Sequence, residues 1–288
     1  MYLKNAIAFG LLAISAGCGL DQMGRVSSDF HYSYDLKPGG SLSVETFNGS
    51  AEITGWDQDT VDISGTKYAP ANELLASLRI DIDHTPDSVD IHAARPSDSR
   101  GNYGARFVIK VPRTTIVNRV VSSNGPVRIS DVAGPSRLRT SNGPIRVHDV
   151  HGGIQAQTGN GAIELAEVDG EVEAHTTNGA IRANLAASGP AARPVRLETT
   201  NGGIDLTLPS NYPSDIHAGT TNGGITLHVP GDLNARLSAR TTNSSVSSDF
   251  QVKAVGEISR RRLEGTIGSG GPQIELTTTN GGIHLRKL

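Results

Sequence analysis

The 288-residue sequence is poor in cysteine, in aromatic residues and in excess basic charge. Its single cysteine, Cys18, cannot form an intramolecular disulfide, so disulfides do not stabilise the fold. Aromatic residues make up only 4% of the chain, which argues against a wide core filled with rings. The 26 basic and 29 acidic side chains give a net charge of -3, whereas proteins that bind nucleic acid usually carry a concentrated basic face. We therefore expect no nucleic-acid partner.

The N-terminal apolar run is too short for a transmembrane helix, which needs about 20 apolar residues. Lys4 precedes apolar residues from Ala6 to Ile14, and small residues then lead to Cys18, which is the layout of a secretory signal. The stretch "SAGC" resembles the bacterial lipobox, although Ser15 stands where that motif prefers Leu. The alternative is an ordinary signal peptide followed by a spare thiol.

From this segment we predict a signal peptide over residues 1–17 and a tether over residues 18–29. Lipidation of Cys18 would make the membrane the first partner of the protein. The predicted localisation is an exported, membrane-anchored lipoprotein that is either periplasmic or at the cell surface.

Glycine is abundant, with 34 residues, and many of these glycines belong to copies of one phrase, "TTNGGI" or a close variant. The spacings between copies from Asn124 onward are 18, 18, 18, 23, 21, 21 and 37 residues. Each copy has Thr or Ser two positions before its asparagine and Ile, Val or Ala three positions after it. The asparagines of the nine copies are Asn48, Asn124, Asn142, Asn160, Asn178, Asn201, Asn222, Asn243 and Asn280.

Each repeat predicts two short strands joined by tight bends. After Asn142, Ile145 and Val147 alternate with Arg146, "HDVHGG" interrupts the pattern, and the alternation resumes at Ile154. A period of two is typical of half-buried strands, and Gly and Asp are typical of turns. At the corner we expect the asparagine to adopt a left-handed conformation, the next glycine to avoid a Cβ clash, and the threonine to line the inside of the bend.

Two architectures fit this pattern. "NG" between alternating runs favours hairpins, and therefore an antiparallel β meander. Near-identical repeats favour stacking of like on like, and therefore an all-β, single-stranded parallel β-helix or β-solenoid of 18–23-residue coils, which we prefer. Residues 30–115 are less regular and predict an N-terminal β cap, whereas residues 116–288 predict the solenoid repeats.

Few residues point to catalysis. The acidic run "ELAEVDGEVEA" (residues 164–174) contains carboxylates of the kind that polysaccharide-cleaving enzymes use in pairs, but alternation places most of them on the outward, solvated face. The histidines show no metal-ligand spacing, and no nucleophile motif is present, so we expect no metal, no cofactor and no catalytic residue. A basic cluster of Arg260, Arg261 and Arg262 is a candidate anion-binding site.

Several stretches resemble the bacterial adhesin-like family of β-strand repeats called domain-of-unknown-function family 4097. They are the "TTNGGI" units, "VPRTT" at residues 111–115, and the ending "ARTTNSSVSSDF…ISRRRLEGTIGSGGPQIELTTTNGGIHL". The resemblance covers roughly residues 38–288 and implies an exported β-helix with no established enzymatic activity. The predicted function is a non-enzymatic, lipid-anchored, adhesin-like β-solenoid of the bacterial cell envelope that acts as a binding or structural module for a glycan or an envelope protein. The alternative is a polysaccharide-cleaving enzyme on a β-helix.

Overall fold

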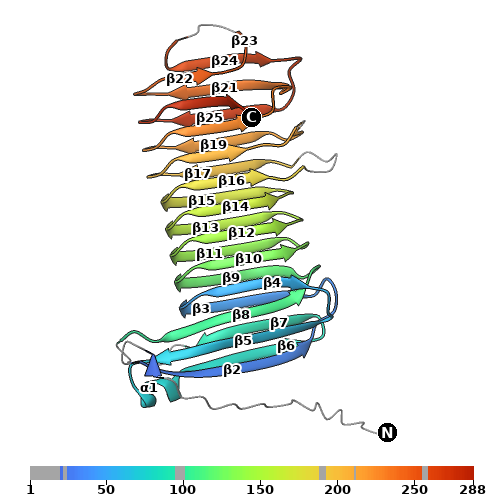
Figure 1. Ribbon diagram of the computed structural model, residues 1–288, viewed down its shortest axis with the longest axis vertical. Helices are drawn as coiled ribbons and strands as arrows, with labels where there is room; N and C mark the ends of the chain where they lie inside the picture. Colours follow the sequence, from blue (N-terminus) through green and yellow to red (C-terminus); the bar gives the residue numbers. More distant parts are fainter. Residues whose placement is uncertain (1–19, 22–24, 95–100, 188–192, 211, 255–258) are drawn as a thin grey trace.

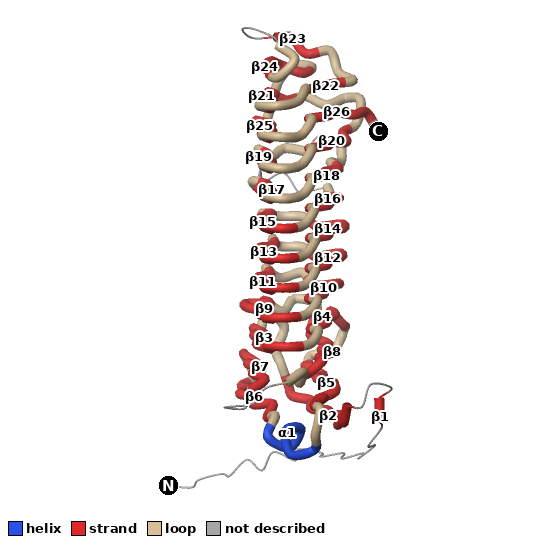
Figure 2. Tube along the Cα trace, turned by 90° about the vertical axis from the view of Figure 1, so that its left-hand side faces the viewer, coloured by secondary structure: helices blue, strands red, loops and turns tan. Residues whose placement is uncertain are grey.

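The computed structural model describes residues 20–21, 25–94, 101–187, 193–210, 212–254 and 259–288. Two 13-stranded sheets face each other along a long rod (Figures 1 and 2). The described part of the chain contains one short helix, α1 (Asn72–Ser77), at one end of the rod. No helix in these ranges has the length and apolar character needed to cross a bilayer.

The two sheets, A and B, have the following strands in spatial order. Sheet A consists of β1 (Leu20–Asp21), β2 (Arg25–Asp35), β5 (Thr60–Ala69), β8 (Gly104–Pro112), β4 (Ala51–Trp56), β10 (Val127–Val132), β12 (Ile145–Val150), β14 (Ile163–Val168), β16 (Ile181–Leu185), β18 (Ile204–Thr207), β20 (Ile225–Val229), β26 (Ile283–Lys287) and β22 (Val246–Ser248). Sheet B consists of β23 (Val252–Ala254), β24 (Arg262–Ile267), β21 (Ala235–Thr241), β25 (Gln273–Thr278), β19 (Ile216–Thr220), β17 (Val195–Thr199), β15 (Val172–Asn178), β13 (Ile154–Asn160), β11 (Ser136–Asn142), β9 (Ile116–Asn124), β3 (Ser41–Asn48), β7 (Ser88–Ala94) and β6 (Arg79–Thr85).

The core follows directly from the alternation in the sequence. In β12, Ile145 and Val147 are buried between the sheets, whereas Arg146 and His148 face solvent. Fully burying an aliphatic side chain of this size contributes about 1.5–3 kcal/mol. Since one inward Ile, Leu, Val or Ala recurs at the same position of each coil, the core is a continuous narrow column, and it needs few aromatic rings.

The repeats form a parallel solenoid, which confirms the predicted fold class and excludes the antiparallel meander for them. β10, β12, β14 and β16 are parallel neighbours, and Ile145 pairs with Ile163, which in turn pairs with Ile181. On the opposite face β11, β13, β15 and β17 are also parallel. Each coil therefore contributes one strand to each sheet, and equivalent residues lie one above the next.

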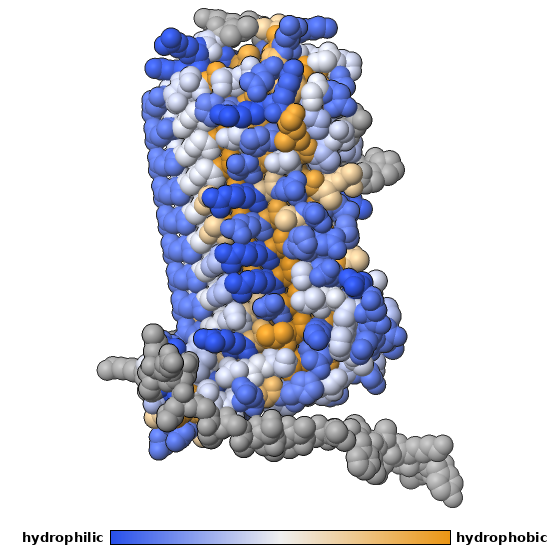
Figure 3. Space-filling model, in the orientation of Figure 1, coloured by the Kyte–Doolittle hydropathy of each residue, from blue (hydrophilic) through white to orange (hydrophobic). Residues whose placement is uncertain are grey.

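The asparagine corners form a ladder of side-chain amides along one edge of the rod. Asn142 Nδ2 donates to Asn124 Oδ1 at 2.8 Å, and Asn160 Nδ2 donates to Asn142 Oδ1 at 2.7 Å. The same bond continues through the remaining corners, in the spatial order Asn48, Asn124, Asn142, Asn160, Asn178, Asn201, Asn222, Asn280 and Asn243. This edge is hydrophilic along the rod, as the blue column at the left of Figure 3 shows.

The glycine and threonine of each corner complete this arrangement. A Cβ at Gly161 would collide with the carbonyl oxygen of Gly143 in the neighbouring coil, so the coils can stack this closely only with glycine there. The buried Thr158 hydroxyl donates to that same carbonyl at 2.9 Å. The backbone hydrogen-bonding capacity of the corner is thereby satisfied without water.

The left-handed conformation expected for the corner asparagines is wrong. Among the described non-glycine residues, a positive φ occurs at Asp131, Asp149 and Glu167, which are the last residues but one of β10, β12 and β14, just before the other bend of the coil. Asn48, Asn124, Asn142, Asn160 and Asn178 instead end their strands, and the other four corner asparagines follow two residues after theirs. We infer that asparagine is selected for the ladder, because a carboxamide both donates and accepts.

Coil order departs from sequence order at the C-terminal end. β25 lies between β19 and β21, and β26 lies between β20 and β22. The coil made of β25 and β26 is therefore inserted between two coils that precede it in the sequence. The hairpin strand β24 then covers the outer edge of β21 in antiparallel pairing, which closes this end of sheet B.

Antiparallel strands also cover the N-terminal end. β2 pairs with β5, β5 pairs with β8, and β6 pairs with β7, all antiparallel. β2 begins at Arg25, so residues 25–29, which the sequence assigned to the tether, are part of this cap. Cys18 and the predicted signal peptide lie outside the described residues.

Candidate functional site

The outer face of sheet B carries two columns of polar side chains. Parallel pairing aligns Gln155 of β13 with Glu173 of β15, and Glu173 with Arg196 of β17. The full first column is Arg137, Gln155, Glu173, Arg196, His217 and Glu275. The second column contains Arg139, Gln157, His175 and Glu198 in successive coils. The coil repeat thus gathers on one face side chains that are far apart in sequence.

Two adjoining hollows follow these columns along the rod. The first has a volume of ≈ 550 Å³ and runs from Asn118 on β9 to Glu198 on β17. The second, of ≈ 430 Å³, runs from β15 to Glu275 on β25. Glu173 and Arg196 line both, so the two hollows form one continuous depression, which we call the sheet B hollow.

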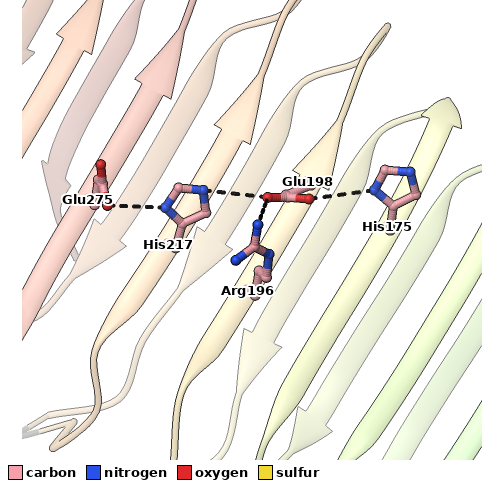
Figure 4. A network of polar contacts seen from close by, with 5 residues as sticks. All are labelled: His175, Arg196, Glu198, His217 and Glu275. Carbon is pink, nitrogen blue, oxygen red and sulfur yellow. Dashed lines mark hydrogen bonds and ion pairs between the residues drawn. The ribbon is translucent and has the colours of Figure 1, made fainter.

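The distal half of the sheet B hollow holds a network centred on Glu198 (Figure 4). Arg196 Nη2 donates to Glu198 Oε1 at 2.6 Å. His175 Nδ1 and His217 Nε2 lie 3.8 and 3.6 Å from the Glu198 carboxylate oxygens. His217 Nδ1 lies 3.3 Å from Glu275 Oε2. Five side chains from four coils therefore hold one another in place at the surface.

The proximal half of the hollow has a different character. Arg137 Nε donates to Gln155 Oε1 at 3.1 Å, and its Nη1 reaches Asn118 Oδ1 at 3.5 Å. Both partners are neutral, and no carboxylate of the described residues lies within 4.0 Å of Arg137 or Arg139. In the described part of the chain, the side chains of Arg139 and Gln157 have no hydrogen-bond partner. This half therefore presents uncompensated positive charge and free amide groups.

The predicted anion site at the end of the rod is partly occupied by its own ion pairs. Arg262 Nη2 donates to Glu264 Oε2 at 2.7 Å, and Arg240 also binds Glu264. Hydrogen bonds from Arg262 and Arg240 lower the pKa of Glu264 to about 2. Arg260 and Arg261 are exposed in the turn before β24. The three arginines therefore do not converge on one point.

The acidic run that suggested catalysis is divided between different surfaces. Glu164 lies on the outer face of sheet A, where Arg146 Nε donates to it at 2.9 Å. Glu167 lies near the end of β14, next to the bend, and Glu173 lies on sheet B. A pair of facing carboxylates, as glycoside hydrolysis requires, is not formed by this run.

The histidine motif "HDVH" forms a bend rather than a metal site. His151 lies between two carboxylates, with Nε2 2.9 Å from Asp149 Oδ1 and Nδ1 2.9 Å from Asp169 Oδ2. The hydrogen bond to Asp169 raises the pKa of His151. Over the ranges that the structure describes, no group of three or more His, Cys, Asp or Glu residues has metal-binding geometry.

The sheet B hollow was not identified from the sequence, although a signal for it exists. Its side chains stand three and five positions before the asparagine of each repeat, for example Gln157 and Gln155 before Asn160. The outward positions after each asparagine, such as Arg146, lie on sheet A instead. The outward positions before each asparagine therefore belong to sheet B, and the outward positions after it belong to sheet A.

The C-terminal part of the chain matches the model of a known protein family. Residues 197–286, from β17 to β26, match the model of the Toastrack family, domain of unknown function 4097. The predicted family resemblance is confirmed. The Toastrack match includes the inserted coil, the Glu198 end of the sheet B hollow and the turn that contains Arg260 and Arg261. No curated protein matches the sequence.

Two solved structures are similar to the chain. One is a "putative cell adhesion protein" from Clostridium sporogenes, with 11% identity, coverage of 91% of this chain and 100% of that chain, and a TM-score of 0.29. The other is a "putative adhesin" from Bacteroides fragilis, with 13% identity, coverage of 91% and 97%, and a TM-score of 0.36. TM-scores this low indicate a loose correspondence of the two traces.

Proposed function

We propose that this protein is a non-catalytic, adhesin-like binding module of the bacterial cell envelope and that the sheet B hollow is its binding surface. The observation that carries the proposal is the continuous hollow itself, built by the outward side chains of successive coils. Arg139 and Gln157 within it have no partner among the described residues. Polar groups without partners in a concave surface are available to a ligand.

The charge arrangement supports binding rather than hydrolysis. A glycosidase needs one carboxyl group that donates a proton and a second that faces the same bond. The Glu198 carboxylate is engaged by Arg196 and flanked by two histidines, so its oxygens already have partners. The hollow is also a shallow surface depression, so water is not excluded from it as a catalytic cleft requires.

The proposed location follows from Cys18 and the position of the cap. If Cys18 carries the lipid, the anchor precedes β2, and β2 lies at the cap end of the rod (Figure 1). The cap would then face the membrane, and the rod would project away from it with the sheet B hollow along its side. This orientation presents the hollow to an extended polymer or to an envelope protein, either in the periplasm or at the cell surface.

Binding can be tested with the labelled full-length protein and isolated cell envelopes. Gln157→Trp places a bulky side chain in the hollow and should abolish binding whatever the chemistry of the ligand. Asn184→Trp is the matched control. Asn184 is exposed on the outer face of sheet A, and its side chain has no partner in the described structure. Equal binding by the two variants would remove the hollow from the proposal, and absence of binding by the wild type would overturn the function.

Catalysis and anchoring need separate measurements. The chain length of envelope polysaccharides should stay unchanged after incubation with the protein, and progressive shortening would establish the enzyme alternative. Cys18→Ala should move the protein from the membrane to the soluble fraction, because the acyl chains supply the membrane affinity. Unchanged membrane retention of this variant would contradict the lipid anchor.

A further inference from the structure

We infer that the proximal half of the sheet B hollow binds the carboxylate groups of an acidic polysaccharide that contains uronic acid residues. The inference rests on the proposed function and names the ligand class of the same surface. It is carried by Arg137 and Arg139, by the amides beside them and by the carboxylates of the neighbouring coils.

The two arginines provide a charge that the protein itself does not neutralise. Arg137 and Arg139 lie two residues apart on β11 and point to the same side of sheet B. At the two ends of the larger hollow the arginines are paired, Arg119 with Glu45 at 3.0 Å and Arg196 with Glu198 at 2.6 Å. A guanidinium group binds a carboxylate through two parallel hydrogen bonds, which makes it the preferred partner for this group.

The amides next to the arginines suit hydroxyl groups. Gln155 and Gln157 occupy the next coil, and Asn118 lies in the preceding one. A carboxamide both donates and accepts, so it can bond to a sugar hydroxyl in either role. Guanidinium groups flanked by amides therefore match an acidic sugar, which carries one carboxylate and several hydroxyls.

The direction of the hollow suits a linear polymer. Its lining residues come from successive coils, which are spaced by about 4.8 Å, and this spacing is similar to the length of one sugar residue in an extended chain. The volume of ≈ 550 Å³ is within the range of about 300–1,000 Å³ that is usual for ligand sites. A polysaccharide lying along the rod would thus meet a new pair of side chains at each sugar.

The carboxylates of the hollow limit where a negative charge can bind. Glu173 follows Gln155 in its column, so an acidic side chain lies two coils beyond Arg137. A sugar carboxylate placed against Glu173 would be repelled. The arginine coil is therefore the place for a uronic acid, and the Glu173 coil suits the hydroxyl groups of a neutral sugar.

The test compares four polymers for binding to the full-length protein. The probes are hyaluronan, its carboxyl-reduced derivative, polygalacturonate and poly-glutamate. Hyaluronan should bind more tightly than its carboxyl-reduced derivative and poly-glutamate, and carboxyl reduction should abolish the difference in binding between the wild type and the arginine variants. Arg137→Gln and Arg139→Gln should each weaken hyaluronan binding about tenfold, the usual effect of losing a hydrogen bond to a charged group.

Two variants serve as controls. Arg128→Gln removes a sheet A arginine that has no carboxylate partner in the described structure, and it should leave hyaluronan binding unchanged. Glu173→Gln should strengthen polygalacturonate binding, because it removes one of the repelling charges. Since all four positions lie on the outer faces, melting temperatures equal to that of the wild type verify folding.

The outcomes separate this inference from the proposed function. Equal binding of hyaluronan and its reduced derivative, or full binding by Arg139→Gln, overturns the acidic-glycan inference. Tighter binding of poly-glutamate would overturn it as well and assign the hollow to an acidic protein segment. If hyaluronan fails to bind while Gln157→Trp still abolishes envelope binding, the inference fails and the proposed function stands.

Discussion

Asn160 Nδ2 donates to Asn142 Oδ1 at 2.7 Å, and Asn142 donates in the same direction to Asn124. Every amide in the ladder therefore has the same orientation. An internal asparagine makes two of these bonds, whereas Asn243, at the C-terminal end of the stack, makes one.

This difference predicts a graded loss of stability. Asn160→Ala should lower the free energy of unfolding by about 1 kcal/mol, since two solvent-exposed hydrogen bonds are lost at roughly 0.5 kcal/mol each. Asn243→Ala should cost about half as much. Urea denaturation monitored by circular dichroism measures both, and equal losses would contradict a ladder in which the bonds act independently.

The corner glycines predict a steric effect that depends on position. Gly161→Ala should destabilise the protein by about 2 kcal/mol, because the added Cβ collides with the Gly143 carbonyl and the coils must separate. Gly219→Ala is the matched control, since a Cβ there meets only the His217 ring at 3.6 Å. Thermal unfolding should show a lower melting temperature for the first variant alone.

Replacing the inward threonines should change the free energy of unfolding in opposite directions at two equivalent positions. Thr158→Val removes the hydroxyl that bonds to the Gly143 carbonyl and should cost about 1 kcal/mol. Thr46 is buried at the first corner, but its Oγ1 has no hydrogen-bond partner among the described residues. Thr46→Val should therefore raise the free energy of unfolding by about 1 kcal/mol. A loss of stability in both variants would show that the Thr46 hydroxyl is satisfied in solution.

The inserted coil predicts which cysteine pairs can form a disulfide. Thr226 of β20 is the direct neighbour of His284 of β26, and Ser247 of β22 lies on the far side of β26. In a Cys18→Ser background, Thr226→Cys with His284→Cys should cross-link, because a disulfide needs Cα atoms within about 7 Å. Thr226→Cys with Ser247→Cys should not. The reverse result on a non-reducing gel would establish stacking in sequence order.

His151 predicts a small dependence of stability on pH. The Asp169 hydrogen bond raises the pKa of His151, so its stabilising contribution is fully present below the unfolded-state pKa of about 6.5 and is lost as the pH rises through the folded-state pKa. Because the side chain is half exposed, the contribution should stay below about 1 kcal/mol.

The measurement is the difference in unfolding free energy between wild type and His151→Gln, followed from about pH 5 to about pH 8. The difference should decrease with rising pH. His148→Gln is the control for the loss of a histidine that has no acidic partner within the described structure. A difference for His151→Gln that does not depend on pH would contradict the clamp formed by Asp149 and Asp169.

Much of this fold could be predicted from the sequence because stacking repeats one local pattern. The period-two alternation around Ile145 and the recurring asparagines were sufficient for a parallel solenoid with nine corners. They were not sufficient to explain why the corner residue is asparagine, since a left-handed turn and an interstrand amide ladder both favour Asn before Gly. Only the positions of the neighbouring coils distinguish the two.

The order of the last coils and the side-chain contacts within the sheet B hollow could not be predicted for a related reason. The phrases at Asn222 and Asn280 both read TTNGGI, whereas the phrase at Asn243 reads TTNSSV, and this difference alone does not specify which coil stacks beside β19 and β20. The Glu198 network requires side-chain distances across four coils, which depend on that order: Glu275 reaches His217 only because β25 was inserted beside β19.

The inserted coil also determines when the rod can be completed during synthesis. β21 and β22 leave the ribosome before β25 and β26. In the stack, however, β25 and β26 lie between β21 and β22 and the rest of the rod. A nascent chain that ends before β25 therefore has an open parallel edge at β19 and β20, and β21 can reach that edge only in a non-native position. Correct growth of the solenoid requires β25 and β26 to pair with β19 and β20 before β21 and β22 take their native place, so the coil at the tip of the rod stacks after the coil that follows it in the sequence.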